Sequence, residues 1–556
     1  MDLPLTAEAL TRSAQTPPAQ EVTHFRHILV WPVHLTRSAN CGTSHDLAEI
    51  FTKLAPDNPW YEVADEFTGD PADFQERHYN EFVTFLPPVQ RFLYGQGRTR
   101  CGNPIKVMRR ADIAEVRVTL APGAEPTRLK VTHIDLYFFF DIDVAILAFE
   151  VSAEGIALAT AQEIMFRLGR AYPAYWEKDG SPGHCPWLVE WLTQGGEVLA
   201  ASDLGDRAKY LAYVCQNRTA RVAAHWEFLL KPLVPHDSEH AGALRYRQLE
   251  YYRMPLMAFL ALAEPDELTR ADYVRLALAS GSGNRGQLPF TERHLADFES
   301  KYCYDRYHEK REANDWPGTR FMSCGHAFVV TGDAANPFFV DAERGFLNAF
   351  RHQHFLLFLI AHFHKAALLM FSDRLSEAVN RLDVDDPKAV KDFRAATRLA
   401  LETFLRFTHR YWFHSVSNQD QAHELFALCR RHLELDELYE DVRQEVQEMS
   451  QYLENEAARR QNDSMVRLTV VTACGRSGTV ATGFLGMNLF DHANLDPATK
   501  AGIFVAVFIP TMILTFYTIA KSQRLFEFLD AIADENHGVG TRLRSFIDIW
   551  RRRRSS

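Results

Sequence analysis

The sequence has few cysteines, and none of them has a partner at metal-binding spacing. Its eight cysteines among 556 residues are scattered, without a Cys-x-x-Cys pair. This pattern argues against a zinc module and a disulfide framework, and it is typical of a reducing cytoplasm. The sequence also lacks a Walker loop and a dinucleotide fingerprint, so no nucleotide-dependent enzyme class is indicated.

Excess positive charge and a targeting segment are also lacking. The net charge is -11, which argues against a nucleic-acid partner. The first residues include Asp2, Pro4 and Glu8, where a signal peptide would carry a basic start and an apolar core. We therefore expect the large N-terminal part to stay in the cytoplasm. No internal repeat and no low-complexity tract is evident.

Length and apolar patterning divide the chain into several parts. At 556 residues the chain is longer than a typical single domain. Alternating strands and helices predict an α/β (or α+β) domain, followed by a helical region and two apolar segments. The expected parts are a disordered leader at 1–24, a cytoplasmic α/β domain at 25–340, a helical stalk at 341–464, a transmembrane hairpin at 465–521 and a cytoplasmic basic tail at 522–556.

Strand signals dominate the start of the α/β domain. A strand is expected at 27–35, and Pro32 places it at an edge or a bulge. The apolar run 137–151 predicts two buried strands joined at Asp141 and Asp143. Turn residues at 121–126 predict a hairpin between 114–120 and 129–136. Further elements are expected as helices at 158–170, 244–262 and 267–278 and as a strand at 326–331.

From about Gly345 the sequence predicts nearly continuous helix. The apolar stretch 355–371 carries His362, His364 and Lys365 in its middle, whereas a membrane span needs about 20 residues with few charges. We therefore expect a buried helix there. Pro387 fits the first turn of the next helix. The charged stretch 417–462 predicts a long helix, which fits either a stalk or a solvated surface helix.

Two segments with membrane character follow, at 465–485 and 501–520. The first is rich in small and hydroxyl residues, which let helices pack closely in a membrane, and the second is more apolar. Basic residues flank the pair, and the connecting loop carries Asp491 and Asp496, so the positive-inside rule places both ends in the cytoplasm. A polar inner helix and an apolar outer helix in each subunit imply an oligomer that closes a pore.

The residues Gly486, Met487 and Asn488 close the first of these segments. Gly-Met-Asn at this place, after a long charged helix, resembles the signature of the CorA family of divalent-cation channels, and the resemblance covers about 412–521. It implies a CorA-like homopentameric funnel that passes Mg²⁺, or another divalent cation, passively across a bacterial-type inner membrane. It implies no tightly bound cofactor and no enzymatic activity. The expected partners are other copies of the chain, the lipid bilayer and an unknown cytoplasmic ligand.

Residues at steps of three or four along the first segment share one helix face. The resemblance implies that this face lines the pore, with an apolar gate at Met465 and Leu468, and a hydroxyl ring at Thr479. Gly486, Met487 and Asn488 then form the selectivity loop, whose neutral oxygens suit Mg²⁺ because that ion dehydrates reluctantly. The residues assigned to the pore are Met465, Leu468, Thr472, Arg476, Thr479 and Gly483.

Arg476 departs from the family pattern, in which an apolar residue faces the pore. A divalent cation about 5 Å from one arginine meets a repulsion of roughly 7 kcal/mol at an effective dielectric of about 20. The loop also lacks the Met-Pro-Glu continuation that is usual after Gly-Met-Asn. Arg476 is therefore either a filter or lock of altered selectivity, or a residue that turns between helices and caps backbone or lipid headgroups.

Acidic clusters give further candidate sites. Asp491 and Asp496 either concentrate cations at the pore entrance or are ordinary loop residues. Asp383, Asp385 and Asp386 fit a cytoplasmic divalent-ion sensor, because hard cations prefer clustered carboxylates, or else they belong to a solvated loop. Core or interface roles are expected for the histidines at 352, 354, 362 and 364, because residues two apart do not share a helix face.

Three rival functions stay open beside a divalent-cation channel. The first is a pore of altered selectivity, permeable to anions or opened by a ligand of the large domain. The second is a non-conducting membrane receptor or scaffold. The third is an enzyme with its active site within 25–340, for which the sequence names no catalytic set: a thiol and an imidazole occur at Cys324 and His326, without a supporting base.

Overall fold

The computed structural model describes the larger part of the chain, with gaps. The described residues are 20–37, 47–53, 58–63, 76–95, 104–240, 242–283, 288–308, 318–383, 386–486, 496–499, 501–502, 505–506, 509–510, 513 and 517. The chain divides into two compact units, Met1–Val446 (unit 1) and Gln447–Ser556 (unit 2). Each unit is described by itself.

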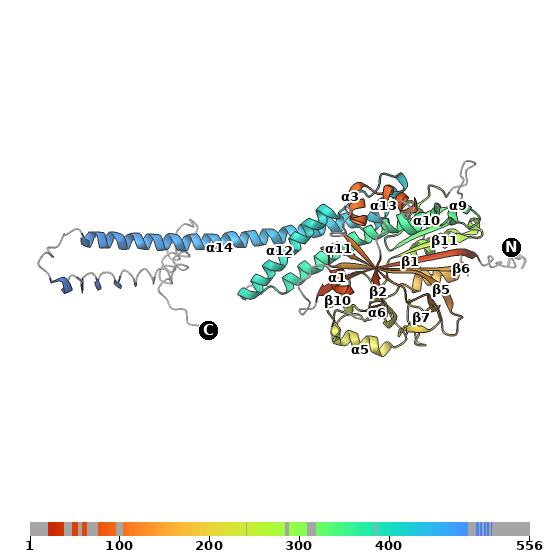
Figure 1. Ribbon diagram of the computed structural model, residues 1–556, viewed down its shortest axis with the longest axis horizontal. Helices are drawn as coiled ribbons and strands as arrows, with labels where there is room; N and C mark the ends of the chain where they lie inside the picture. The colour runs from red at the N-terminus through yellow and green to blue at the C-terminus, as the bar shows by residue number, and fades with distance from the viewer. Residues whose placement is uncertain are drawn as a thin grey trace, which may run out of the picture. The chain divides into compact units, whose positions relative to one another are not determined.

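A 14-stranded sheet forms the centre of unit 1 (Figure 1). Its strands are β1 (Glu21–Arg37), β2 (Trp60–Glu62), β3 (Ile105–Arg110), β4 (Glu115–Thr119), β5 (Thr127–Phe139), β6 (Val144–Ala157), β7 (Leu188–Leu192), β8 (Val198–Ala201), β9 (Val234–Pro235), β10 (Leu244–Gln248), β11 (Leu256–Leu262), β12 (Cys303–Tyr304), β13 (Arg320–Ser323) and β14 (Ala327–Asp333). The main path runs β12-β13-β14-β11-β1-β6-β5-β4-β7-β8. The predicted mixed α/β domain is confirmed.

Strand β1 lies inside the sheet although it contains Pro32. It pairs with β6 on one side; on the other it pairs with β11 up to Leu29 and with β10 from Val33 onward. The amide of Val30 donates to the Pro255 carbonyl, and residue 32 faces the same side, where the ladder changes from β11 to β10. The missing N–H of proline therefore costs no ladder bond, and the predicted edge or bulge is wrong.

The predicted hairpin and the predicted pair of buried strands are confirmed. β4 and β5 pair antiparallel across the turn at 121–126, and β5 and β6 pair across the turn that holds Asp141 and Asp143. Asp141 has a φ of 64°, in the left-handed region that aspartate tolerates better than most residues. The expected leader ends too late, because β1 already begins at Glu21; residues 1–19 lie outside the described residues.

The predicted helix at 244–262 is wrong, because β10 and β11 occupy this stretch. β11 has the sequence Leu-Met-Ala-Phe-Leu-Ala-Leu, and all seven residues are buried. A short apolar run with no alternation cannot be told from a buried helix by its period. The strands are extended because β11 is enclosed between β1 and β14 on both sides.

Helices surround the sheet and supply the C-terminal part of unit 1. They are α1 (Leu47–Thr52), α2 (Glu76–Thr84), α3 (Pro87–Tyr94), α4 (Leu158–Arg167), α5 (Arg207–Asn217), α6 (Ala224–Leu230), the 3-10 turn η2 (Pro265–Glu267), α7 (Arg270–Leu278), α8 (Glu292–Tyr302), α9 (Pro337–Val340), α10 (Phe346–Ala349), the π-helical turn η3 (Phe350–His354), α11 (Phe355–Asn380), α12 (Pro387–Arg410) and α13 (Asp420–His432). The helices α4 and α7 match the helices predicted at 158–170 and 267–278, and β14 matches the strand predicted at 326–331.

Helix α11 is a core helix of unit 1, as the sequence predicts. It packs against α12, α13, β1 and β6, and α11 and α12 lie side by side in Figure 1. The continuous helical stretch Phe346–Asn380 is long and apolar enough to cross a membrane, yet 78% of its most apolar window is buried inside the protein. His362 and Phe363 are fully buried within it. These contacts favour a role in the core.

The helices after α11 begin and end at residues with clear local causes. Pro387 starts α12, and the carboxylate of Asp386 caps it by accepting from the Lys388 amide. α13 ends at His432, and Glu434, two residues later, has a φ of 54°, the left-handed conformation that commonly follows a helix C-terminus. The long helix expected across 417–462 is therefore wrong at this joint. A new helix, α14 (Leu435–Gly486, 52 residues), begins there.

The described part of unit 2 consists of the later part of α14, residues 496–499, and helical residues between 501 and 517. α14 starts in unit 1 and continues to Gly486. The helical residues Ala501, Val505, Ile509 and Ile513 lie within the segment 501–520 that the sequence predicts as the outer membrane helix. The basic tail at 522–556 lies outside the described residues.

Candidate functional site

The predicted pore residues lie along one face of α14. The helix is unbroken from Met465 to Gly486, and steps of three or four residues at 100° per residue keep these positions within a narrow stripe. Met465 and Leu468 are 59% and 68% exposed in a single chain. Two large apolar side chains are thus exposed on one turn of the helix.

Hydroxyl groups follow the apolar pair along the stripe. The hydroxyl of Thr472 donates to the Leu468 carbonyl at 2.7 Å, and that of Thr479 donates to the Gly475 carbonyl at 3.0 Å. Each threonine thus places its proton on the preceding turn, which leaves oxygen lone pairs on the outside of the helix. Such oxygens can accept hydrogen bonds from the waters of a hydrated cation.

Several predicted site residues cannot be placed. Gly486 is the last residue of α14, Gly483 lies on the stripe, and Arg476 is helical, but the side chain of Arg476 is not among those described. Met487, Asn488 and Asp491 lie outside the described residues. Asp496 is exposed and opens a short turn in which the Thr499 amide donates to its carbonyl. Their assignments stay predictions.

The segment 465–485 is helical but less apolar than a typical membrane span. Among the described residues, only the helix at 346–380 is long and apolar enough to cross a membrane. Arg467 and Arg476, together with the glycines and threonines of this segment, lower its hydropathy. Its crossing of a membrane, and that of 501–520, stays a prediction.

The structure describes part of the acidic cluster that precedes α12. Asp386 is the N-cap of α12, and Asp383 lies just before the break, while Asp385 is outside the described residues. Within the described part of the chain, no three His, Cys, Asp or Glu side chains are placed to hold a metal ion together. The cytoplasmic ion sensor stays a prediction.

Three of the four histidines at 352–364 are buried in the core, and His352 is half-buried. His364 donates from Nε2 to the Tyr411 carbonyl at 2.6 Å, and His354 packs edge-on against Phe321. Burial lowers the pKa of His364 to about 3 and that of His354 to about 4, so both rings stay neutral at physiological pH. This agrees with the core roles that their spacing predicts.

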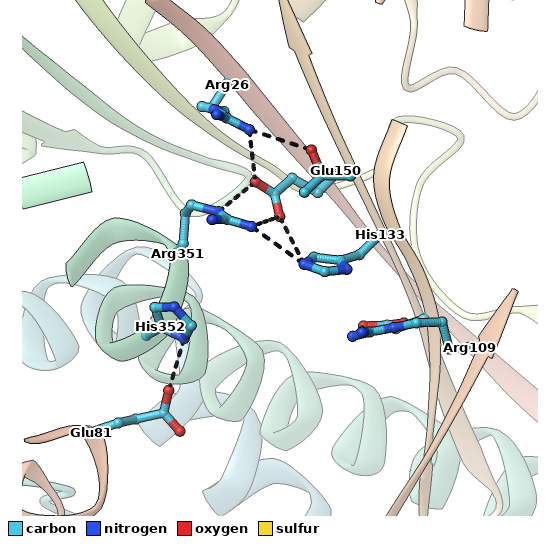
Figure 2. A network of polar contacts seen from close by, with 9 residues as sticks. Arg26, Glu81, Arg109, His133, Glu150, Arg351 and His352 are labelled. Carbon is cyan, nitrogen blue, oxygen red and sulfur yellow. Dashed lines mark hydrogen bonds and ion pairs between the residues drawn. The ribbon is translucent and has the colours of Figure 1, made fainter. Parts of the chain in front are cut away.

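A polar cluster around Glu150 was not predicted from the sequence. Glu150 is buried, and its carboxylate accepts from Arg351 at 2.8 and 3.3 Å (Figure 2). Arg26 and His133 approach the same carboxylate at 3.8 and 3.9 Å. The residues come from β1, β5, β6 and η3, so they are far apart in sequence and no motif announces them.

The π-helical turn η3 brings two consecutive side chains to this region. Arg351 reaches Glu150, and His352 lies 3.1 Å from the carboxylate of Glu81 (Figure 2). A π-turn inserts an extra residue in a helix, which redirects the side chains that follow, and such turns are frequent at functional sites. The cluster thus fixes the start of α11 on the sheet.

A second line of ion pairs joins α11 itself to the sheet side of unit 1. Lys365 lies 3.3 Å from Glu250, and Asp373 lies 3.0 Å from Arg247. Burial raises the pKa of Glu250, but the nearby His362, 3.6 Å away, and Lys365 lower it more, so the net pKa is lowered. Arg374 also bonds to Asp143 in the β5–β6 turn. These contacts hold α11 along its whole length.

The beginning of α14 is anchored to the same helices inside unit 1. Tyr439 stacks on Trp412 with ring centroids 4.5 Å apart. The hydroxyl of Ser372 on α11 donates to Glu445 at 3.4 Å. α11 therefore contacts both the sheet and the first turns of the helix that carries the predicted pore stripe.

The comparisons with known proteins bear on the C-terminal part of the chain. Residues 390–521 match the family described as CorA-like Mg²⁺ transporter protein. Over these residues the chain is similar to the CorA-like family. This CorA-like region includes most of α12, all of α13 and α14, and the residues Gly486, Met487 and Asn488. It leaves the 14-stranded sheet and the Glu150 cluster outside.

The remaining comparisons add little to the CorA-like match. No curated protein matches the chain. A solved structure described as the complete CorA magnesium transporter from Methanocaldococcus jannaschii is 14% identical, over 51% of this chain and 94% of that chain, with a TM-score of 0.19. A TM-score this low supports no comparison of the folds.

Proposed function

We propose that the chain is a CorA-type membrane transporter that passes divalent cations passively through a pore closed by several copies of itself. The match of residues 390–521 to the CorA-like family carries this proposal. A homopentamer and Mg²⁺ as first cargo extend it, as the Gly-Met-Asn resemblance implies. No catalytic role is proposed.

The exposed stripe on α14 supports the proposal. One chain leaves Met465 and Leu468 uncovered, and in a symmetric ring the same positions of neighbouring copies would face one another around the axis. They would form apolar rings that close by dewetting, and Thr472 and Thr479 would offer hydroxyl oxygens above them. Val505, Ile509 and Ile513, 45–60% exposed, would face lipid.

Unit 1 would serve as the cytoplasmic sensor of this pore. α11 is tied to the sheet by ion pairs and touches the first turns of α14. A change in the sheet region can therefore act on the helix that enters the predicted membrane part. The charged residues Asp491, Asp496, Asp383, Asp385 and Asp386 would then act on the cation as entrance and sensor groups.

Arg476 supports a second candidate, a CorA-like pore of altered selectivity. Its place on the stripe between Thr472 and Thr479 would put one positive charge per subunit close to the axis. A ring of such charges repels divalent cations and attracts anions. In this candidate Arg476 is the filter or lock.

Ion flux into proteoliposomes tests both candidates. Purified protein is reconstituted, and uptake of Mg²⁺, Zn²⁺, Co²⁺ and chloride is followed in parallel. Divalent uptake that falls about tenfold or more in Asn488→Ala supports the CorA-type pore, because the loop oxygens would hold the hydrated ion. Chloride uptake in place of divalent uptake supports the arginine filter.

Two variants sharpen this experiment. Arg476→Leu should raise divalent uptake if the arginines restrain a cation pore, and should abolish chloride uptake if they form a filter. Ser477→Ala is the control, because residue 477 lies about 100° around the helix from Arg476. Absence of any flux, with the protein assembled and folded, would favour a receptor or scaffold.

A further inference from the structure

Two arginines meet at the junction of α4 and β11. Arg170 follows α4 and Arg253 precedes β11, and their backbones form an isolated antiparallel bridge. The Met254 amide donates to the Gly169 carbonyl and the Ala171 amide to the Tyr252 carbonyl, each at 2.8 Å. The bridge fixes two positive side chains next to each other.

The side chain of Arg170 is enclosed by aromatic rings. It is 3% exposed, and its guanidinium lies 4.9 Å from the ring centroid of Phe166 and 5.0 Å from that of Tyr252. Its Nε donates to the Phe166 carbonyl at 2.9 Å, which caps the end of α4. The terminal nitrogens form no hydrogen bond with any described residue.

The side chain of Arg253 is satisfied only in part. Nη2 donates to the carbonyls of Leu278 and Ala279, at 3.0 and 2.5 Å, at the end of α7. Its Nε is buried and has no hydrogen-bond partner in the described part of the chain. Capping a helix end therefore uses only part of this guanidinium, and an unbonded buried N–H carries a desolvation cost.

The absence of a carboxylate sets this pair apart. The described residues include five buried arginines, and four of them pair with an aspartate: Arg110 with Asp112, Arg221 with Asp203, Arg320 with Asp305 and Arg430 with Asp436. Arg170 is the exception, and no described carboxylate pairs with Arg253 either. An uncompensated buried charge is strongly unfavourable, so the buried Arg170 beside the half-buried Arg253 calls for an anion.

The arginine and histidine side chains next to the pair are positively charged or neutral. Arg167 is already neutralised by Glu163 at 2.6 Å. His184 bonds through Nδ1 to the Tyr252 hydroxyl at 2.9 Å, and His326 bonds to the Leu278 carbonyl at 3.2 Å. Burial and then the charge of Arg170 lower the pKa of His184, and burial with the charge of Arg253 lowers that of His326 to about 4.

The pair lies near the surface of unit 1. Tyr251, next to the bridge, is 70% exposed, and Ser280 and Ser282 on the loop after α7 are exposed. A small solute can therefore approach along this rim. The nearby rings and the burial of Arg170 keep water from its guanidinium, which strengthens the attraction of its free nitrogens for an anion.

We propose that Arg170 and Arg253 form a binding site for a small oxyanion, a phosphate or carboxylate group of a cytoplasmic solute. The planar guanidinium offers paired N–H donors that match the oxygen spacing of both groups. The bound oxyanion satisfies the Nε of Arg253 and neutralises the pair. The site does not depend on what the C-terminal part transports.

Isothermal titration of the full-length protein in detergent tests the site. The probes are inorganic phosphate, pyrophosphate and acetate, and saturable binding of at least one of them is expected. Arg170→Gln and Arg253→Gln should each weaken that binding by about tenfold or more, because each removes a charge-assisted contact. A comparison of the affinities for phosphate and for acetate shows which oxyanion the site prefers.

Arg117→Gln is the matched control, since Arg117 has a carboxylate partner in Glu190 at 2.8 Å and lies on β4. It removes the same charge and should leave binding unchanged. Equal affinity in all three variants, or no saturable binding of any probe to the unaltered protein, overturns the site.

Hydrogen exchange covers the case in which an arginine variant does not fold. In the unaltered protein, the probe that binds should slow amide exchange at 169–172 and 252–255 and leave 115–119 unchanged. Equal effects on all three stretches would also overturn the site. Because flux is not measured, failure of this site leaves the proposed transport untouched, and the reverse also holds.

Discussion

At the scale of single residues, the carboxylate of Glu150 attracts two arginines, Arg351 and Arg26. The ring of His133 approaches the same carboxylate from a third element. Arg351 also donates to His133 Nε2 at 3.3 Å, which requires a neutral imidazole there. Burial and the charge of Arg109 lower the pKa of His133, in agreement with that role. The carboxylate therefore fixes η3 on the sheet.

Glu150→Gln is expected to lower the free energy of unfolding of unit 1 by about 2–4 kcal/mol, because Arg351 loses a charged partner at a site where water does not replace it. Urea unfolding of the full chain, followed by tryptophan fluorescence, measures it. Glu154→Gln is the control on the same strand: Glu154 is 59% exposed and pairs with His24, and its loss should cost under about 1 kcal/mol. Equal costs for the two would show that Glu150 does not anchor η3.

At the scale of elements, the joint between α13 and α14 is defined by one strained residue. Glu434 has a φ of 54°, a conformation that glycine adopts freely and that costs other residues about 1 kcal/mol. The Glu434 amide donates to the Arg431 carbonyl, and the Leu438 amide donates to the Glu434 carbonyl. The residue thus closes one helix and opens the next.

Glu434→Gly should stabilise unit 1 by about 0.5–1 kcal/mol, because glycine relieves this strain. The same exchange at Glu437, in the first turn of α14, should destabilise it by about 1 kcal/mol, because glycine is a poor helix former. Thermal unfolding of the two variants measures both. Stabilisation at both positions, or at neither, would contradict the assigned joint.

Elements with a local signal could be predicted from the sequence, and elements defined by distant contacts could not. The β4–β5 hairpin follows from its turn residues, and α12 follows from Pro387. The sequence predicts a helix at β11 because the neighbours that make it a strand, β1 and β14, lie more than 60 residues away along the chain. The joint at Glu434 has no glycine to mark it.

The candidate site also has a part that the sequence predicts and a part that depends on distant contacts. The stripe on α14 follows from helical spacing, so Met465, Leu468, Thr472 and Thr479 could be assigned to one face before the fold was known. The Glu150 cluster and the Arg170–Arg253 pair each join residues from separate elements. Sequence alone gives no register between such elements, and a buried arginine looks like an exposed one until its partners are placed.

At the scale of the whole molecule, buried histidines make unit 1 sensitive to acid. Burial lowers the pKa of His27, His225 and His364 to about 3 and that of His354 to about 4. Each ring therefore stays neutral in the folded state while the unfolded chain takes up a proton below about 6.5. Stability is full above that pH and falls as the pH drops toward the folded pKa values.

The free energy of unfolding should fall by about 1.4 kcal/mol per pH unit for each such histidine between pH 6 and about 4. Urea unfolding at several pH values measures the slope. His354→Gln should reduce the slope by about 1.4 kcal/mol per pH unit, which is the contribution of one proton. His24→Gln, at a partly exposed position, should change the slope less. Stability that is flat or rises on acidification would show that these rings are not buried neutral.

The turn at Gly325, between β13 and β14, limits how this chain can vary in evolution. A Cβ there would lie 2.6 Å from the His432 carbonyl, and the φ of 81° already disfavours any side chain. Two backbones touch at this point, one ending β13 and the other ending α13. Position 325 should therefore remain glycine in every descendant that keeps this joint, while nearby residues drift. A relative with a different residue there would have to carry another connection ahead of its long helix.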